Sequence, residues 1–416
     1  MSKVCIIGGG IIGLSSALYL KRSGWEVTVL DKGDFSDNCS YGNAGYVCPS
    51  HFIPLATPGI IKLGLKWMLN ARSPFYVQPR LDFNLINWGL KFMQSATAEK
   101  VEQAAIPLRD IALISQAEFM DWRNIPGFDM ALEQQGLIEL FQTDAAGEHG
   151  KHHVEKAIEL GLDARFLSME QILEMEPGVN IVAKGGIYFD CDSHLYPNKL
   201  MKSLIQHLKK EGVALLGNEE VKTCKSTAGK ITHIISEKNE YAADNIVLAT
   251  GSWSRGVGKM LGLNFPLVAG RGYSLTLENS PYKLNHPSVL MEGRVALTPM
   301  DGNKIRFGGT MEITSHKTPP KMKRVQGILD AVKRYYPDFD VPLPPVENIW
   351  YGYRPCSADG IPYIGKAGKW ENVVVATGHA MVGLSLGAGT GKLVDEIISD
   401  KKLSMDISPF NPDRFN

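Results

Sequence analysis

The sequence carries no net charge, because its 44 lysines and arginines balance its 44 aspartates and glutamates. Proteins that bind nucleic acid through its phosphates have a basic excess, so we expect no nucleic-acid partner. The six cysteines include no Cys-x-x-Cys pair and no metal-type spacing, so we expect reduced thiols and no metal site. No apolar run is long enough to cross a bilayer. These absences predict a cytoplasmic globular protein.

Near the N-terminus, the sequence predicts a glycine-rich turn between a strand and a helix. An apolar, β-branched run at residues 4–7 precedes the turn, and residues at helical spacing follow it. Glycines in the order Gly-x-Gly-x-x-Gly allow a sharp turn and a close approach to a pyrophosphate, which the helix N-terminus attracts. A second strand ends at Asp31, near the spacing of an acid that binds ribose hydroxyls. The three glycines are Gly8, Gly10 and Gly13. Residues 1–33 are therefore predicted to bind a dinucleotide.

Small residues also follow the ends of later predicted elements. The loop at residues 42–45 reads Gly-Asn-Ala-Gly, and the buried strand at 245–249 ends in a Thr-Gly pair. Near the C-terminus a strand at 373–376 is followed by a glycine turn and by a helix expected at 384–398. Because strand, glycine turn and helix recur there, we expect this segment to rejoin the nucleotide-binding sheet.

Two other stretches predict a second region. Residues 262–345 alternate short strands with turns, which is typical of an antiparallel sheet. Residues 54–98 combine aliphatic and aromatic residues with lysine and arginine, and no acid stands between His51 and Arg80. This pattern predicts two short amphipathic helices broken by prolines. Their apolar faces either pack against the rest of the domain or form a basic, aromatic surface for the inner face of a membrane.

Four anchors along the chain carry a family resemblance. They are GGGIIG with Asp31, GNAG at 42–45, LATGSWS at 248–254, and GYRPCSADGIPYIG at 352–365 followed by ATGHAMVGLSLGAGTGKLVDEI. Together they resemble the amine-oxidising flavoprotein superfamily of D-amino-acid oxidase, glycine oxidase, sarcosine oxidase and the bacterial D-amino-acid dehydrogenases. The resemblance covers nearly the whole chain. Its nearest form is the small subunit of D-amino-acid dehydrogenase, because the GNAG loop precedes an aromatic insertion.

The resemblance implies an α/β fold with two domains. A Rossmann-like FAD-binding domain is expected from residues 1–53, 185–260 and 346–400. A discontinuous α+β substrate domain, built on an antiparallel sheet, is expected from residues 54–184 and 261–345. The aromatic and basic insertion at 54–98 belongs to this second domain.

The resemblance also implies noncovalent FAD. Family members with a covalent flavin carry a cysteine near the place of Gly352, and Cys356 is displaced from it. The helix near Leu384 is expected to direct its positive end at the flavin. The residues implied to bind FAD are Gly8, Gly10, Ile11, Ile12, Gly13, Asp31, Lys32, Gly42, Asn43, Ala44, Gly45, Val47, Val221, Thr250, Gly251, Trp253, Gly378, His379, Gly383, Leu384 and Ser385.

Three residues are candidates for catalysis. Arg354 is implied to pair with the carboxylate of an amino acid, since a guanidinium fork matches that planar anion; a structural arginine is the alternative. Tyr273 is a candidate for a second hydrogen bond to the carboxylate, or a core tyrosine. His51 is a candidate base or positioning group, and no protein base is needed if the amine binds neutral.

These residues leave three functions open. The first is FAD-dependent oxidative deamination of D-amino acids, with D-proline and hydroxyproline among the candidates. Hydride passes from Cα to flavin N5, the imine hydrolyses to a 2-oxo acid, and a quinone or other carrier takes the electrons. The second is an oxygen-using oxidase of glycine or an N-methyl amino acid. The third is a non-catalytic FAD subunit that carries electrons.

Overall fold

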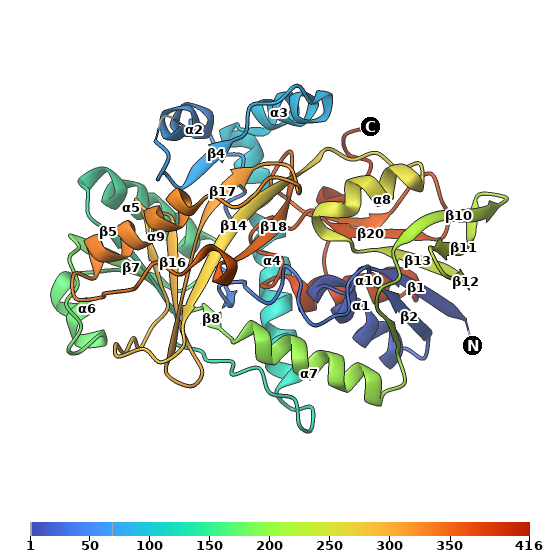
Figure 1. The fold of residues 1–416 in the computed structure, drawn as a ribbon, viewed down its shortest axis with the longest axis horizontal. Helices are drawn as coiled ribbons and strands as arrows, with labels where there is room; N and C mark the ends of the chain where they lie inside the picture. The colour runs from blue at the N-terminus through green and yellow to red at the C-terminus, as the bar shows by residue number, and fades with distance from the viewer. Residues whose placement is uncertain (1, 69) are drawn as a thin grey trace.

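The computed structural model describes residues 2–68 and 70–416. Met1 and Leu69, which fall within the predicted FAD-binding and insertion ranges, lie outside the described residues. Two sheets lie side by side, one of six strands and one of nine. In Figure 1 the six-stranded sheet is on the right and the nine-stranded sheet on the left, with α2 and α3 at the top, beside β4.

The six-stranded sheet contains the N-terminal glycine turn. Its strands are parallel except for β19 at the edge, which runs antiparallel to β20. The prediction that the C-terminal segment rejoins this sheet is therefore confirmed. In spatial order the strands are β19 (Tyr363–Lys366), β20 (Val373–Thr377), β13 (Asn245–Leu248), β1 (Lys3–Ile7), β2 (Glu26–Leu30) and β9 (Ala214–Leu216).

Both faces of this sheet are covered, as the apolar run in β1 predicts. Val4 and Ile6 lie in a core with helices, and Cys5 and Ile7 lie in a second core on the opposite face. The helices of the first core are α1 (Ile11–Arg22), α4 (Ala98–Trp122), α7 (Pro197–Lys210) and α10 (Gly387–Ile398). The second core is closed by β10 (Val221–Thr227), β11 (Lys230–Ser236), β12 (Glu240–Ala242) and α8 (Ser254–Met260).

Helix α10 lies very close to α1 and α4 because glycines face them. A Cβ at Gly387 would lie 2.7 Å from the Ile11 side chain, and one at Gly391 would lie 2.5 Å from the Ser15 carbonyl carbon. The prediction that the helix begins at residue 384 is wrong by three residues, since residues 384–386 form the turn that leads into α10.

The nine-stranded sheet forms the second region, and the predicted antiparallel sheet is confirmed. Its pairings are antiparallel apart from β15 with β5 and β17 with β4. In order the strands are β18 (Trp350–Ser357), β14 (Leu267–Leu277), β17 (Lys304–Ile313), β16 (Val295–Met300), β15 (Ser288–Leu290), β5 (Leu137–Phe141), β7 (Gly185–Phe189) and β6 (Ala164–Leu167), with β4 (Phe75–Val77) paired to β17. Its helices are α5 (Asp144–Glu159), α6 (Met169–Met175) and α9 (Met322–Tyr335).

Two strands pair outside the predicted domain ranges. Strands β7 and β18 fall in ranges assigned to the FAD-binding domain, but both pair within the nine-stranded sheet. The cause is hydrogen-bond pairing with distant strands, which neither segment reveals by its own residue pattern. A small sheet of β3 (Tyr46–Val47) and β8 (Ser193–His194) lies beyond the two large sheets.

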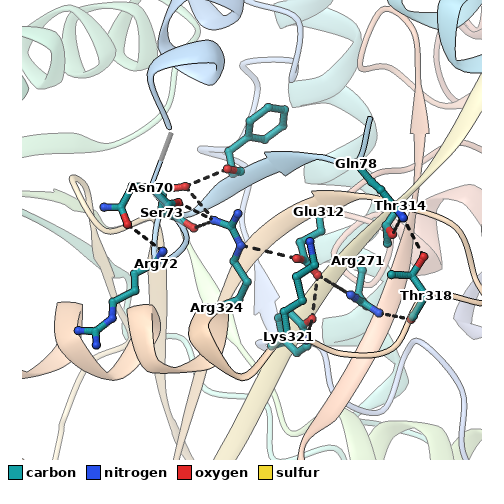
Figure 2. A network of polar contacts seen from close by, with 12 residues as sticks. Asn70, Arg72, Ser73, Gln78, Arg271, Glu312, Thr314, Thr318, Lys321 and Arg324 are labelled. Carbon is teal, nitrogen blue, oxygen red and sulfur yellow. Dashed lines mark hydrogen bonds and ion pairs between the residues drawn. The ribbon is translucent and has the colours of Figure 1, made fainter. Parts of the chain in front are cut away.

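The insertion contains the two predicted helices, α2 (Ile60–Met68) and α3 (Phe83–Ser95), with β4 between them. Buried polar contacts attach it to the nine-stranded sheet: Arg324 Nη1 donates to the Ser73 carbonyl at 2.7 Å, and Thr314 Oγ1 donates to Gln78 Oε1 at 2.6 Å (Figure 2). Across residues 2–68 and 70–416, no helix has both the length and the apolar character needed to span a membrane.

Candidate functional site

A cavity of about 1380 Å³ lies between the two large sheets and extends to the insertion. It exceeds the roughly 300–1,000 Å³ of ordinary ligand pockets, so it has room for a large cofactor together with a small substrate. Most predicted site residues line it. They are Gly8, Gly10, Ile11, Ile12, Asp31, Lys32, Gly42, Asn43, Ala44, His51, Val221, Thr250, Gly251, Trp253, Tyr273, Arg354, His379, Gly383, Leu384 and Ser385.

The glycine turn after β1 fits a dinucleotide. Gly8 has φ +114°, and a Cβ there would lie 2.4 Å from the Ala249 carbonyl oxygen. A Cβ at Gly13 would lie 1.9 Å from the Gly8 carbonyl oxygen, so only glycine lets the turn and α1 pack together. Gly10, by contrast, faces open space apart from Ser40 Oγ at 3.6 Å. The position that must admit a pyrophosphate is therefore the one that is open.

The N-termini of α1 and α10 both adjoin the cavity. Neither helix has a side-chain N-cap in the described part of the chain, so first-turn N–H groups and the helix dipole are left to favour an anionic ligand. Gly10 precedes α1, and the cavity residues Leu384 and Ser385 precede α10. Ser385 Oγ also accepts a hydrogen bond from Cys48 N at 2.9 Å, which ties the two loops together.

Asp31 lies at the end of β2 and lines the cavity. Its carboxylate accepts hydrogen bonds from Gly9 N at 2.6 Å and from Gly33 N at 2.7 Å. An ionised carboxylate has about four lone-pair sites, so these two bonds orient Asp31 and leave acceptor capacity for hydroxyl groups of a ribose.

Four predicted FAD-binding residues do not line the cavity in the described part of the chain: Gly13, Gly45, Val47 and Gly378. They support its walls instead. A Cβ at Gly45 would lie 2.1 Å from the Leu195 carbonyl oxygen, and Gly378 has φ +82° against the ring of Tyr363. Val47 is fully buried in the helix-covered core.

Aromatic and cation–π contacts hold the Trp253 ring in place at the cavity wall. Lys32 Nζ lies 3.5 Å from the centroid of the Trp253 ring. The Trp253 ring also stacks on His316, with centroids 4.7 Å apart, and meets Tyr353 edge-on at 6.0 Å. Burial lowers the pKa of His316 to about 4, so this histidine is neutral at pH 7. The cation over the indole fixes the ring at the cavity wall.

Arg354 on β18 places a guanidinium at the cavity wall. Its Nη1 donates to the Thr310 carbonyl. No carboxylate in residues 2–68 or 70–416 forms an ion pair with it. Gly272 provides the space, because a Cβ there would lie 2.3 Å from the guanidinium carbon. Burial lowers the pKa of Arg354, and a partly buried cation without an anion is costly unless a ligand supplies the charge.

The surroundings of Tyr273 fit the alternative of a core tyrosine. The hydroxyl donates to Glu312 Oε2 at 2.8 Å and accepts from Lys321 N at 2.8 Å. The side chain is 1% exposed, and its oxygen is held inside a buried polar cluster rather than offered to a substrate. The cavity does contain another tyrosine that the sequence reasoning missed, Tyr351, which is 40% exposed two residues before Tyr353.

The two histidines of the predicted site, His379 and His51, differ in their surroundings. His379 is buried, its Nε2 lies 3.0 Å from Thr390 Oγ1, and burial lowers its pKa to about 3. It is therefore a neutral structural group. His51 lines the cavity, and its Nδ1 lies 3.2 Å from Ser50 Oγ.

The sequence reasoning also missed acidic groups behind His51. Asp192 is 1% exposed and accepts from Ser50 Oγ at 2.6 Å. The ligand atoms of Cys48, His51 and Asp192 lie within 4.8 Å of one another, so the structure does bring together a group able to hold a metal ion. No spacing rule finds this group, because Asp192 is 142 positions from Ser50.

Comparison with known proteins agrees with this geometry. The family described as FAD dependent oxidoreductase matches residues 3–397. The chain is 30% identical over 415 residues to a D-amino acid dehydrogenase of Granulibacter bethesdensis, with 97% of each chain covered. It is 28% identical over 413 residues to one of Vibrio vulnificus, with 96% of each covered.

Solved structures share the fold. A glycine oxidase from Geobacillus kaustophilus superposes with a TM-score of 0.78 at 23% identity, covering 100% of both chains. An L-amino acid deaminase from Proteus vulgaris gives a TM-score of 0.75 at 15% identity, covering 100% of this chain and 97% of the other. The predicted fold class, the resemblance and the FAD cofactor are confirmed. The chain belongs to the family of FAD-dependent oxidoreductases.

Proposed function

We propose that this chain is an FAD-dependent D-amino-acid dehydrogenase. The observation that carries the proposal is Arg354, a guanidinium without an acidic partner in the described chain, at the wall of a cavity shaped for a dinucleotide. A planar fork of donors matches the carboxylate of an amino acid and fixes its orientation. The D configuration is supported by the similarity to proteins named D-amino acid dehydrogenase.

Different residues along the cavity have different proposed roles in binding the cofactor and the substrate. Asp31 and the turn at Gly8 and Gly10 would hold the adenosine and pyrophosphate half of FAD. The N-terminus of α10 would stabilise negative charge on the flavin. The bound flavin supplies the acceptor for a hydride from the substrate Cα, which leaves an imine that water converts to a 2-oxo acid and ammonia. Arg354 anchors the carboxylate, and Tyr351 replaces Tyr273 as the candidate second donor.

We propose that FAD is held without a covalent bond. Cys356 is 0% exposed, and its thiol packs toward Gly270 rather than into the cavity. Burial raises the pKa of this thiol to about 12, so the thiolate needed for attachment is scarce at pH 7. Release of all yellow colour from acid-precipitated protein supports this assignment, and a flavin retained in the pellet contradicts it.

An anaerobic screen of flavin bleaching tests the activity. The purified protein is mixed with D- and L-amino acids, including both prolines, glycine and sarcosine, and absorbance of the flavin is followed. We expect D-amino acids to bleach the flavin and L-isomers to leave it oxidised. Bleaching by glycine or sarcosine, with one peroxide formed per substrate in air, identifies an oxidase instead. A flavin that no amine reduces identifies an electron-carrier subunit.

We further propose that the insertion contacts a membrane from its inner, cytoplasmic face and admits a lipophilic electron acceptor such as a quinone. Four apolar side chains of α3 lie on one stripe and are 48–89% exposed, and their contact with lipid would remove this area from water. They are Phe83, Ile86, Leu90 and Met93. Lys62 and Lys66 on α2 are exposed, and no ion pair engages them in the described chain.

The cavity runs from Arg354 to this apolar surface, which supports entry of an acceptor there. Ile61 and Leu65 of α2, and Ile86 and Leu90 of α3, line the cavity and are exposed. In Figure 1, α2 and α3 lie together at the top of the molecule, next to β4.

Liposome flotation tests the membrane contact. We expect the protein to float with vesicles that contain anionic lipid, and Phe83→Glu to reduce the floated fraction at least tenfold. The matched control is Ile158→Glu on α5, which is 58% exposed but outside the insertion. Equal flotation of the two variants would contradict the membrane contact, and activity with a soluble acceptor would remain in both.

A further inference from the structure

A chain of polar groups lies directly behind His51. Ser50 Oγ donates to Asp192 Oδ2 at 2.6 Å and lies 3.2 Å from His51 Nδ1. Ser50 and Asp192 are 0% and 1% exposed, while His51 lines the cavity. The chain therefore leads from a buried carboxylate, through a hydroxyl, to an imidazole at the cavity wall.

The hydrogen bonds from His51 to Asp192 determine which ring nitrogen of neutral His51 has the proton. A serine hydroxyl has one hydrogen, and the carboxylate of Asp192 takes it. Ser50 Oγ can then only accept from His51, so the ring proton of neutral His51 lies on Nδ1. This leaves the lone pair of Nε2 without a hydrogen-bond donor among the described residues. His51 is thereby set as a proton acceptor.

Other contacts keep Ser50 in this orientation. Its N–H donates to Asp192 Oδ1 at 3.1 Å, and its carbonyl lies 3.2 Å from His153 Nε2. His153 Nδ1 is in turn 3.6 Å from Glu139 Oε2. The backbone of Ser50 is therefore held on two sides, and its N–H and its hydroxyl donate to the two oxygens of the same carboxylate.

We propose that Asp192 and Ser50 position His51 to accept the proton that the substrate ammonium group must lose. This inference rests on the proposed amino-acid oxidation. One N–H bond of the ammonium breaks, one Nε2–H bond forms, and no electrons change hands in the step. The neutral amine has the lone pair that assists departure of the hydride from Cα. Arg354 and His51 line the same cavity, and the proposal assigns the carboxylate of the zwitterion to Arg354 and its ammonium group to His51.

The surroundings compensate the charge that His51 acquires. Asp192 faces it through Ser50, and Glu139 is the second carboxylate of this wall. The other titratable groups around the ring are His153, Cys48, Cys191 and Tyr46. Burial raises the pKa of Asp192, and the hydrogen bonds from Ser50 oppose this shift. Protonated His51 thus has a buried carboxylate behind it, connected through the Ser50 hydroxyl.

The ring tautomer tests the positioning directly, without turnover. In the FAD-loaded protein with ¹⁵N-labelled histidine, we expect His51 to show a protonated Nδ1 and an unprotonated Nε2. Asp192→Asn replaces the acceptor by an amide that donates to Ser50, so its hydroxyl donates to Nδ1 and the proton moves to Nε2. A proton on Nε2 in the wild type, or an unchanged tautomer in Asp192→Asn, would overturn the proposal.

The pH profile of flavin reduction tests the proton transfer. We expect His51→Gln and Asp192→Asn to slow anaerobic reduction about a hundredfold at pH 7 and to recover above the pKa of the substrate ammonium, where the amine arrives neutral. His207→Gln on α7, outside the cavity, is the control. A loss of the same size at every pH, or no loss, would overturn the proposal.

Two further outcomes separate this proposal from its alternatives. If no amino acid reduces the wild-type flavin, the proposed function fails and the tautomer still tests the positioning. If Zn²⁺ binds the FAD-loaded protein in a 1:1 ratio and Asp192→Asn abolishes binding, the group of Cys48, His51 and Asp192 is a metal site and the proton-transfer role is wrong. Equal FAD content and equal reduction by dithionite verify that each variant is folded.

Discussion

Two arginines on neighbouring strands lie in opposite electrostatic surroundings. Arg271 on β14 is 0% exposed and donates to Glu312 Oε2 through Nε at 3.0 Å and through Nη2 at 2.7 Å. Arg324 approaches the other oxygen of Glu312 at 3.6 Å, as Figure 2 shows. Arg354 on β18 has a backbone carbonyl as its partner and the cavity beside it.

The difference shows that one arginine of the sheet stabilises the fold, whereas its neighbour is available to bind a ligand. In the buried cluster of Arg271, Glu312, Arg324 and Tyr273, the cations share one carboxylate and donate to backbone carbonyls of the segments they attach. A cation that is neutralised by its own protein has little affinity left for a ligand. Arg354 keeps this affinity because the fold provides a place for the charge without providing the anion.

The largest expected effect is on the buried cluster. Glu312→Gln removes the only carboxylate between Arg271 and Arg324 among the described residues, and we expect it to lower the free energy of unfolding by about 3–5 kcal/mol. Urea unfolding of the FAD-loaded protein measures this. The control Glu278→Gln removes a surface partner of Lys304 and is expected to cost below about 1 kcal/mol. Equal costs would show that the cluster is not a stabilising unit.

Tyr273→Phe tests whether the Tyr273 hydroxyl stabilises the buried cluster or binds the substrate. The change removes a hydrogen bond to the Glu312 carboxylate and leaves Lys321 N without its acceptor, so we expect a loss of stability of about 1.5–3 kcal/mol. The dissociation constant of the substrate should stay within twofold. A large loss of substrate affinity with unchanged stability would return Tyr273 to the site.

Arg354→Lys tests the geometry of the free cation. Lysine keeps the charge but has no planar fork, so we expect substrate affinity to fall about tenfold, or about 1.4 kcal/mol. Anaerobic titration of the flavin absorbance measures the affinity. Full affinity in the lysine variant would mean that charge alone, and not the fork, binds the substrate.

The smallest expected effect concerns the pair of Glu139 and His153. Burial lowers the pKa of His153, but contact with Glu139 outweighs burial and leaves the pKa raised; burial likewise raises the pKa of Glu139, and His153 leaves it lowered. The His153 contribution to stability is complete below about pH 6.5 and is lost above its raised pKa. The Glu139 contribution is complete above about pH 4.3 and is lost below its lowered pKa.

We therefore expect Glu139→Gln to cost most between about pH 4.3 and 6.5, by about 1 kcal/mol, and less as the pH rises further. Unfolding in urea across this range measures the cost. The control Glu155→Gln removes an exposed partner of His152 and should give a flat profile. A cost that grows with rising pH would contradict the assigned direction.

Local residue patterns were sufficient for much of the fold. The glycine turn, Asp31 and the C-terminal strand and helix each carry their signal within a few residues, and the C-terminal strand joins the six-stranded sheet as predicted. The pairing of β7 and β18 was not predictable in this way, because it depends on strands far away in sequence.

The candidate site was predicted less completely for the same physical reason. Nothing near Tyr273 indicates that Glu312 takes its hydroxyl, since the two residues are 39 positions apart and the pairing of β14 with β17 shifts register beside Tyr273. The partnership of Ser50 with Asp192 spans 142 positions. Which polar groups a side chain meets is a property of the tertiary structure, and a single sequence without an alignment contains no direct signal of it.

The most direct measurement compares two ligands, with and without a carboxylate, in two proteins, the wild type and an Arg354 variant. Flavin reduction is compared for the preferred D-amino acid and for the amine that lacks its carboxylate, in the wild type and in Arg354→Met. We predict that the variant loses about a hundredfold in apparent affinity for the amino acid, as expected for a desolvated ion pair, and nothing for the amine. Equal losses for the two ligands, or no loss for either, would contradict the claim that the Arg354 guanidinium binds the substrate carboxylate.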